Sequence, residues 1–400
     1  MDKARREKIL SRGRPTANWE AEPMLGGWYT EEEIDAVVKA IRSSMDWTVG
    51  FGFYCDEIVE FEEKFAEYCG TKYAVSITSA GAGLEMAMMT LDLQPEDEVI
   101  SPAINFWAAD YAIIGQGAKL VFCEVDPETL CADPADIEKR ITPNTRAINV
   151  THMNGLSADM DAILEVAERH PHPKYGPLTV IGDAARACGG EYKGTKIGKK
   201  GSMTVFSFHT MKLMTTLGEG GMITTDDPDI YQRLRAIRMW GAETDGWGAN
   251  YKMTKVQAAV GLVQLRRLDE MNARRYEVGK QRTELLQDVP ELTLPVEPPG
   301  YKHTYYVYTC LVPPEWAGEK RDRLMEMLKN DYGVGSGVLN PPTYYKPFVR
   351  KHTEGQRLPL SEELGARIFC PSLHPLMSDE DNEYVAASIA DAVERVGKEE

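Results

Sequence analysis

The chain has 400 residues, of which 43% are hydrophobic and 27% are charged. Both values are close to ordinary globular usage, which excludes collagen-like, low-complexity and wholly disordered proteins. Because typical domains contain about 100 to 150 residues, the length favours one large and one smaller domain.

The charge and the cysteines restrict the expected partners and compartment. Forty-five Lys and Arg against 62 Asp and Glu give a net charge of −17, and so acidic a field repels nucleic acid backbones and anionic lipid headgroups. The seven cysteines are an odd number without a C-x-x-C pair, which predicts reduced thiols and neither a disulfide framework nor a metal site. Since the sequence shows no secretory h-region and no apolar span of about 18 residues, we expect a cytoplasmic protein.

The first 29 residues are predicted to form an arm, and the pattern after them alternates between helices and strands. Thr30 opens a T-E-E-E capping box before an apolar stripe at helical spacing. Gly70 ends the next amphipathic helix. Helices are predicted over 56–69, 83–91 and 159–170, and strands over 72–78, 98–104, 120–125, 146–153, 178–183 and 203–209.

Strands separated by helical segments predict an α/β fold with a mainly parallel central sheet, helices on both faces and an active site beyond the carboxyl ends of the strands. A long helix is predicted over 254–275, then a Pro-rich segment, a strand over 302–312, and helices over 320–332 and from Ser378. We therefore predict an N-terminal arm (1–29), a large domain (30–265) and a small C-terminal α+β domain (266–400).

Three loops at predicted strand ends carry candidate functional residues. The small residues from Ser79 to Met86 form a strand-to-helix turn, which suits either an anion such as phosphate or close helix packing. Asp183 closes a strand and is either a cap for a following helix or a counter-ion to a pyridinium nitrogen. Lys212 follows a strand and is either an inert surface lysine or a Schiff-base nucleophile. An anion cradle, a carboxylate and a lysine on strand ends are together what pyridoxal phosphate (PLP) catalysis needs.

Four segments carry a resemblance to a known family. FSFHTMK, which ends at Lys212, is followed by GEGGMITTDD, while IGDAARACGG lies upstream and GANYKMTKVQAAV lies downstream. In order and spacing they resemble the DegT/DnrJ/StrS family of keto-sugar and keto-cyclitol aminotransferases. The resemblance includes EIVEFEEKFAEYCGTKYAVSI near the start and ARIFCPSLHPLMSDED near the end, and so covers nearly the whole chain. The resemblance implies a fold type I PLP transferase that works as a homodimer, with active sites at the subunit interface that receive residues from both chains.

The resemblance also implies roles for individual residues. Lys212 matches the Schiff-base lysine, which holds the cofactor at rest and then shuttles the proton between the substrate and the cofactor. Asp183 matches the residue that pairs with the pyridine nitrogen. Phe106 matches the aromatic side chain that stacks on the ring, and Trp107 is its rival.

Four further residues match the family's phosphate ligands. Ala80 and Gly81 fall where backbone N–H groups bind the phosphate, and Ser207 matches a side-chain hydroxyl ligand. Asn250 matches the ligand that the neighbouring subunit donates. Without the motif around them, Phe106 would be interpreted as a core aromatic and Ser207 as an exposed strand hydroxyl.

The sequence departs from the family pattern at two places. Arg186 stands where the family usually has Gln or His, three residues after the cofactor aspartate. Its guanidinium either binds the phenolic oxygen of the cofactor and lowers the pKa of the cofactor linkage, or turns outward to a surface carboxylate. The phosphate turn is Ser79-Ala80-Gly81 and lacks the usual threonine hydroxyl.

The predicted activity is transfer of an amino group from glutamate or glutamine through PLP to a keto sugar, in particular a nucleotide-linked one, or to a keto cyclitol, for a glycan or secondary metabolite such as an antibiotic. Lys212 favours transamination because dehydrating relatives typically carry histidine there. The alternatives are a PLP-dependent lyase or dehydratase, an amino-acid aminotransferase, and a non-catalytic PLP-binding regulatory protein. The expected specificity loops (45–54, 240–251 and 301–305) are aromatic, and Trp47, Trp247 and Tyr251 suit either a sugar or base, or an interface.

Overall fold

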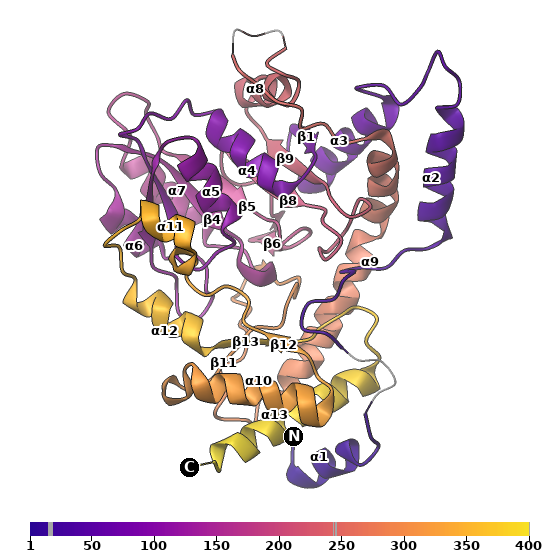
Figure 1. Ribbon diagram of the computed structural model, residues 1–400, viewed down its shortest axis with the longest axis vertical. Coiled ribbons are helices and arrows are strands. Elements are labelled where there is room, and N and C mark those ends of the chain that lie inside the picture. Colours follow the sequence, from indigo (N-terminus) through magenta and orange to yellow (C-terminus); the bar gives the residue numbers. More distant parts are fainter. Residues whose placement is uncertain (15–18, 243, 245, 400) are drawn as a thin grey trace.

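The computed structural model of the chain describes residues 1–14, 19–242, 244 and 246–399. At its centre is a seven-stranded sheet in the order β1-β9-β8-β5-β4-β2-β3 (Figure 1). β9 runs antiparallel to both of its neighbours, and the remaining neighbours are parallel. The strands are β1 (Tyr73–Ile77), β2 (Glu98–Pro102), β3 (Lys119–Cys123), β4 (Thr145–Thr151), β5 (Thr179–Asp183), β8 (Met203–Ser207) and β9 (Gly221–Thr225).

The predicted α/β fold with a mainly parallel sheet is confirmed. β9 is not among the predicted strands, because the glycine-rich run 218–221 leading into it indicates a flexible loop. Gly221 is instead the first residue of β9 and lies opposite Ser207 of β8. The turn between these two strands contains Lys212.

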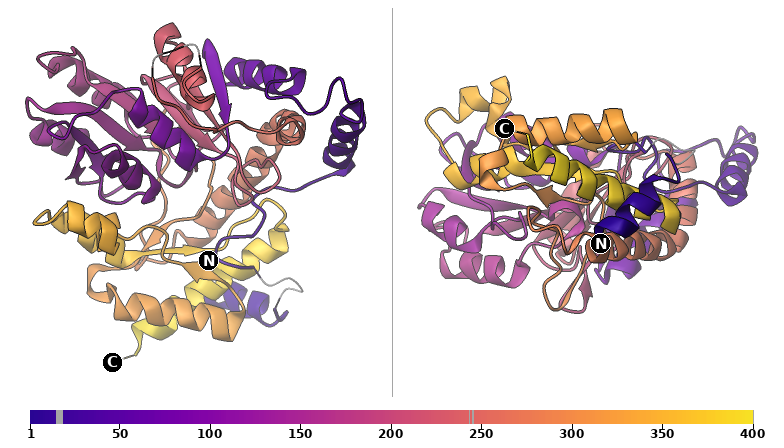
Figure 2. Two further views of the ribbon diagram at one scale, coloured as in Figure 1. Left: turned by 45° about the horizontal axis from the view of Figure 1, so that its top comes forward. Right: turned by 90° about the horizontal axis from the view of Figure 1, so that it is seen from below.

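Helices cover both faces of the sheet (Figure 2). One apolar core lies between the sheet and α4, α5, α8 and α11, and the other between the sheet and α3, α6, α7 and α9. These helices are α3 (Asp56–Cys69), α4 (Ala80–Met89), α5 (Ala108–Gly115), α6 (Pro134–Arg140), α7 (Met160–Arg169), α8 (Pro228–Arg238), α9 (Lys255–Leu286) and α11 (Pro347–His352). The burial of apolar side chains on both faces explains the near-continuous apolar runs of the strands.

A third core belongs to the C-terminal part, where α10 and α13 pack beside a small antiparallel sheet in the order β11-β13-β12. The remaining elements are α1 (Lys3–Leu10), α2 (Glu31–Ser43), α10 (Glu319–Tyr332), α12 (Pro359–Arg367), α13 (Asp379–Gly397), β6 (Glu191–Tyr192), β7 (Thr195–Lys196), β10 (Tyr301–Lys302), β11 (Cys310–Leu311), β12 (Ser336–Gly337) and β13 (Ile368–Pro371). α9 runs through residue 265 without interruption, and the domain boundary there stays a prediction. Within the described ranges, no helix combines the length and apolarity that a membrane crossing requires.

The predicted strand over 302–312 is wrong over most of its length. Only Tyr301–Lys302 and Cys310–Leu311 pair as strands, and Tyr305 between them has a φ of 48°, which breaks the extended conformation. The side chains of Tyr305, Tyr306 and Tyr308 are buried nonetheless. The apolar pattern therefore results from the burial of an irregular segment and not from strand pairing. This segment places the Tyr306 hydroxyl next to Lys212, at the edge of the main sheet.

A buried polar cluster fixes the loop between β2 and α5. The Asn105 side-chain amide donates to Ser101 Oγ at 3.0 Å and to Asp110 Oδ1 at 3.1 Å. Asn149, on β4, donates to the same Ser101 oxygen at 3.1 Å. The cluster sets the position of the loop that carries Phe106. Burial raises the pKa of the Asp110 carboxyl to about 7, against its hydrogen bonds from Thr343, Asn105 and Ser101.

The substitution Asp110→Asn is expected to stabilise the protein at pH 8 but not at pH 4. The folded-state pKa lies above the unfolded value of 3.8, so the stability that protonated Asp110 contributes is lost as the pH rises through about 7. The amide cannot ionise, so the variant does not lose this stability. From pH 4 to pH 8, the difference in the free energy of unfolding between variant and wild type should therefore rise by up to about 4 kcal/mol in favour of the variant. Urea denaturation at both pH values measures this. Glu128→Gln, at an exposed position, is the control, and an equal difference at both pH values would contradict the prediction.

Candidate active site

Lys212 lies in the turn after β8, and its amine faces into the protein. Lys212 Nζ donates a hydrogen bond to Tyr306 Oη at 2.8 Å and lies 4.5 Å from the centroid of that ring. Burial and the nearby Arg186 guanidinium lower the pKa of Lys212 to about 8, although Glu22, Asp183 and Glu219 act in the opposite direction. Close to neutral pH, more of this amine than of an ordinary lysine is therefore unprotonated, which is its nucleophilic form. An inert surface lysine does not fit these surroundings.

Asp183 ends β5, the strand next to β8, and its side chain is buried. Its Oδ1 accepts a hydrogen bond from the N–H of Ala185 at 3.0 Å. Burial raises the pKa of the carboxyl, while the hydrogen bond from Ala185 and the charges of Arg186 and Lys212 lower it. The segment after Asp183 forms turns and then β6, not a helix. The helix-cap interpretation is therefore wrong.

Arg186 is buried and turns inward. Its guanidinium donates to Asn154 Oδ1 at 2.9 Å and lies 5.7 Å from the centroid of the Tyr306 ring. The alternative of a surface carboxylate partner is therefore wrong. Asn154 has a φ of 53° and donates in turn to Thr309 Oγ1 at 2.8 Å. Asn154 thus orients Arg186, a contact that no feature of the sequence signals.

The candidate phosphate ligands lie where β1 and β8 end and β9 begins. Ala80 and Gly81 begin α4, whose first N–H groups have no acceptor within the helix. Ser207 ends β8 and is buried, and its Oγ accepts from the N–H of His209 at 3.3 Å. A Cβ atom at Gly221 would lie 2.6 Å from the carbonyl oxygen of Phe206 and 3.1 Å from the nitrogen of Ala80. Only glycine allows β9 to pass this close to the start of α4.

Phe106 and Trp107 lie in the loop after β2, a strand that runs parallel to β4 and, through it, to β5 and β8. Their ring centroids are 4.1 Å apart, and 40% of Phe106 and 37% of Trp107 is exposed. A core aromatic does not show such exposure, so the core interpretation of Phe106 is wrong. Lys346 Nζ lies 4.1 Å from the centroid of the Trp107 ring. The assignment of the stacking role to Phe106 stays a prediction.

Asn250 makes no described hydrogen bond to the other predicted site residues. It is exposed, and its Oδ1 accepts from Lys252 Nζ at 2.5 Å. The structure describes no hydrogen bond from Asn250 to Lys212, Asp183 or Ser207.

The N-terminal arm crosses directly over the Lys212 turn and contributes a residue to the site. The N–H of Gly26 donates to the carbonyl of Thr210 at 2.9 Å, and Thr210 Oγ1 donates to the carbonyl of Met24 at 2.9 Å. Glu22 accepts a hydrogen bond from the Tyr306 hydroxyl. Glu22 and Tyr306 are the site residues that sequence reasoning missed, and Tyr306 lies one residue beyond an expected specificity loop.

Substituting Gly26 with alanine is expected to disturb the site, because the new Cβ atom would overlap the carbonyl oxygen of Lys212. We expect the free energy of unfolding to fall by about 1 to 3 kcal/mol and the cofactor to bind more weakly. Denaturant unfolding and cofactor titration measure the two effects. Gly115→Ala is the control, since a Cβ atom there meets nothing within 4 Å. Equal free energies of unfolding and equal cofactor affinities in the two variants would show that Gly26 does not lie this close to the Lys212 carbonyl.

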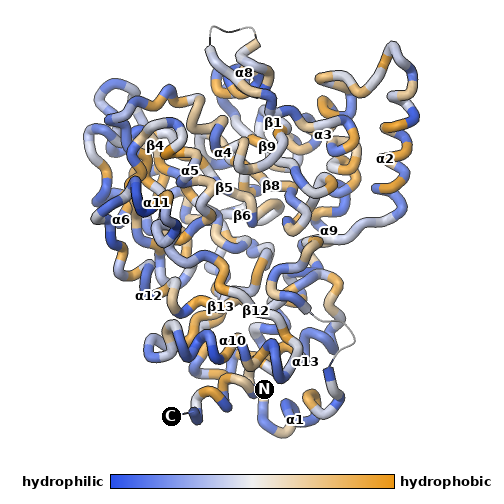
Figure 3. Tube along the Cα trace, viewed as in Figure 1, coloured by the Kyte–Doolittle hydropathy of each residue, from blue (hydrophilic) through white to orange (hydrophobic). Residues whose placement is uncertain are grey.

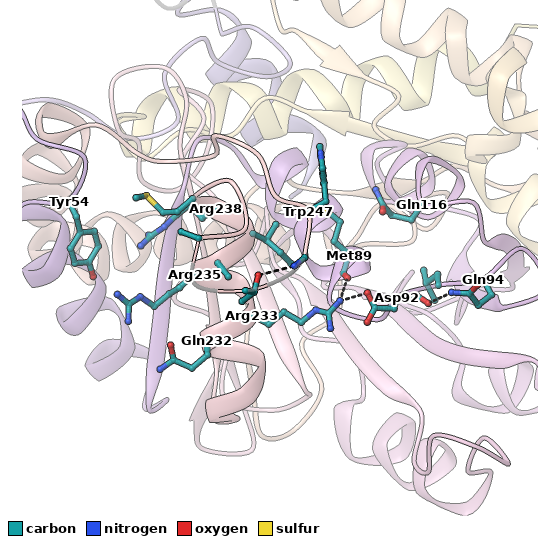
Figure 4. Close-up of a pocket in the computed structure, with 17 residues that line it drawn as sticks. Tyr54, Met89, Asp92, Gln94, Gln116, Gln232, Arg233, Arg235, Arg238 and Trp247 are labelled. Carbon is teal, nitrogen blue, oxygen red and sulfur yellow. Dashed lines mark hydrogen bonds and ion pairs between the residues drawn. The ribbon is translucent and has the colours of Figure 1, made fainter.

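A separate cavity of about 930 Å³ lies beside α8 (Figure 4). Tyr54 and Trp247 line it, so it joins two of the expected specificity loops. Lys212 and the other predicted cofactor residues do not line this cavity. Its guanidinium groups include Arg233, paired with Asp92, and Arg238, paired with Glu62.

Comparisons with known proteins agree with this geometry. Residues 29–390 match the DegT/DnrJ/EryC1/StrS aminotransferase family. The spore coat polysaccharide biosynthesis protein SpsC of Bacillus subtilis is 33% identical over 389 residues, covering 93% of this chain and 96% of that protein. GDP-perosamine synthase of Caulobacter vibrioides is 35% identical over 377 residues, covering 92% of this chain and 96% of that protein. The crystal structure of DesV from S. venezuelae aligns with a TM-score of 0.81 at 31% identity, covering 92% of this chain and 96% of that chain.

The described residues fit the cofactor of this family. The half-buried Lys212 supplies an amine with a pKa of about 8, Asp183 supplies a buried carboxylate, and the start of α4 supplies N–H groups for an anion. Phe106 supplies an exposed aromatic face. The chain therefore belongs to the DegT/DnrJ/EryC1/StrS aminotransferase family and is a PLP-dependent aminotransferase.

Proposed function

We propose that the enzyme transfers an amino group from glutamate or glutamine to a nucleotide-linked keto sugar. The observation that carries this proposal is the buried Lys212 amine beside Asp183, at the carboxyl edge of a parallel sheet. Similarity to GDP-perosamine synthase supports a nucleotide-linked sugar over a keto cyclitol. Seven free cysteines support a cytoplasmic location.

We assign the cofactor contacts as follows. The Asp183 carboxylate would pair with the pyridine nitrogen, and Phe106 would stack on the ring. Arg186, held by Asn154, would donate to the phenolic oxygen. The phosphate would be bound by the N–H groups of Ala80 and Gly81 and by the hydroxyl of Ser207.

Within this arrangement, Lys212 has two tasks. As a free amine it attacks a carbonyl carbon, and at Nζ it takes up and returns the proton that moves during amino transfer. When bound, PLP supplies the electron sink that makes this proton transfer feasible. The low pKa of Lys212 suits both tasks, because the amine must be unprotonated to act as a nucleophile or a base.

We also propose that two copies of the chain share their active sites. α2 lies at the outer side of the molecule, next to α9 (Figures 1 and 3), and the side chains of Ile34 and Ile41 on it are exposed. Trp47 in the following loop is 92% exposed. Exposed apolar surface of this kind usually marks an interface. A second copy would cover it and would receive Asn250, which the chain does not use in its own site.

Mixing two inactive variants tests the shared site. In a mixed dimer of Lys212→Ala and Asn250→Ala subunits, one of the two sites has both wild-type residues. Because half of the randomly assembled dimers are mixed, about a quarter of wild-type activity should return. Recovery of no activity from a dimer that has exchanged subunits would refute the donation of Asn250.

Isotope transfer tests the reaction itself. The enzyme with PLP is incubated with ¹⁵N-labelled glutamate or amino-labelled glutamine and with nucleotide-linked keto sugars or keto cyclitols, and the products are analysed by mass spectrometry. We expect ¹⁵N in an amino sugar nucleotide. A dehydrated sugar without ¹⁵N would indicate a lyase, turnover of amino-acid pairs alone would indicate an amino-acid aminotransferase, and no turnover would favour a regulatory protein.

A further inference from the structure

A chain of two hydrogen bonds joins Lys212 to the N-terminal arm. Lys212 Nζ donates to Tyr306 Oη at 2.8 Å, and the Tyr306 hydroxyl donates to Glu22 Oε1. Tyr306 is 3% exposed, while Lys212 and Glu22 are half-buried. Burial raises the pKa of Tyr306, and Glu22 raises it further, so the phenol keeps its proton and remains a donor to Glu22.

The arm that carries Glu22 is fixed in place by its backbone. The buried guanidinium of Arg275 donates to the carbonyl of Gly26, and His374 Nε2 donates to the carbonyl of Leu25 at 2.8 Å. The ring of Trp19 stacks on His374, with 5.9 Å between centroids. Glu22 is therefore held at the Tyr306 hydroxyl by contacts on both sides of it along the chain.

Each charged side chain near Lys212 has a different hydrogen-bond or ion-pair partner. Asp183 accepts from the N–H of Ala185, and Arg186 donates to Asn154. Glu219, beyond the Lys212 turn, lies 3.9 Å from His209 Nε2. Glu22 is the carboxylate that Lys212 reaches through a single intervening hydroxyl.

We infer that Tyr306 and Glu22 are positioning residues that orient the Lys212 amine and hold the proton that it carries between steps. Tyr306 Oη accepts a hydrogen bond from the Lys212 ammonium, and the Tyr306 hydroxyl donates to Glu22 Oε1. The carboxylate thus stabilises the ammonium through one intervening hydroxyl, until Lys212 gives up its proton during amino transfer. This role rests on the amino transfer proposed above, since only a lysine that is repeatedly released needs it.

Competitive labelling of Lys212 with acetic anhydride tests this in the cofactor-free protein, with peptide mass spectrometry as the readout across pH. Tyr306→Phe removes the acceptor of the ammonium and Glu22→Gln removes a negative charge. Each should lower the labelling midpoint of Lys212 by about one pH unit. If they act as one chain, Glu22→Gln should shift the midpoint less in Tyr306→Phe than in wild type. With PLP, kcat should fall by about 10-fold to 100-fold while the KM of the donor changes less than about three-fold.

Tyr308→Phe and Glu20→Gln are matched controls. The Tyr308 hydroxyl is buried and contacts Thr283, 2.8 Å away, while Glu20 is exposed. Neither should move the Lys212 midpoint. An unchanged midpoint in both Tyr306→Phe and Glu22→Gln, or an equal effect of Glu22→Gln with and without the Tyr306 hydroxyl, would overturn the inference. Labelling needs no substrate, so a wild-type enzyme that aminates no keto sugar would refute the proposed function and not this result.

Discussion

Replacing Lys212 with alanine is expected to lower kcat by at least about 10⁴-fold and to remove the visible band of the bound cofactor. The substitution removes both the nucleophile and the group that moves the proton, and each such function typically contributes about 10²-fold to 10⁴-fold. No described neighbour can replace the amine, because the Tyr306 hydroxyl at 2.8 Å is a protonated phenol whose pKa is raised. Single-turnover kinetics with saturating PLP and donor measure the loss.

Lys199→Ala provides the matched control. That lysine is half-exposed and pairs with Asp226 at 2.6 Å, away from the site residues. Its loss should leave both the band and kcat unchanged. If Lys212→Ala kept the visible band and transferred amine at the wild-type rate, another lysine would carry the chemistry, and the assignment of the site would be wrong.

The substitution Asp183→Asn is expected to lower kcat by about 10²-fold to 10³-fold while leaving the fold intact. The amide keeps the size of the side chain and an oxygen that can accept from Ala185, but it cannot balance a positive charge on the pyridine nitrogen. Losing one such preorganised electrostatic contact typically costs this much. Because Asp183 raises the pKa of Lys212, its removal should lower that pKa further. Steady-state kinetics and the labelling midpoint of Lys212 measure the two effects.

Asp229→Asn, at an exposed position in α8, should leave kcat unchanged. A kcat for Asp183→Asn within about three-fold of wild type would show that the carboxylate charge has no part in the reaction. An effect on cofactor binding alone would instead restrict Asp183 to holding the ring in place.

Local sequence features predicted the elements that present the main candidates. Thr30 caps α2, as its capping box indicates, α13 begins after Ser378, as predicted, and Gly70 ends α3 with a φ of 71°. Lys212 and Asp183 were found because each follows or closes an apolar strand, and the carboxyl ends of parallel strands share one edge of the sheet.

Contacts between distant segments were not predictable in this way. Glu22 reaches Tyr306 across 284 positions of the chain, and no local pattern encodes such a pairing. The direction of Arg186 depends on its hydrogen bond to Asn154, which lies 32 positions away in the chain. The segment with Tyr306 was predicted as a strand because burial, and not pairing, produces its apolar pattern. The role proposed for Asn250 requires a second copy of the chain, whose surface no single sequence describes.

The absorption spectrum of the purified enzyme with PLP, recorded before and after addition of glutamate or glutamine, tests the central claim most directly. We predict a visible band from the covalent link to Lys212, and its conversion to the amine form of the cofactor by one of these donors. The absence of any band in a folded, PLP-saturated protein would contradict the assignment of Lys212 and of the site around it.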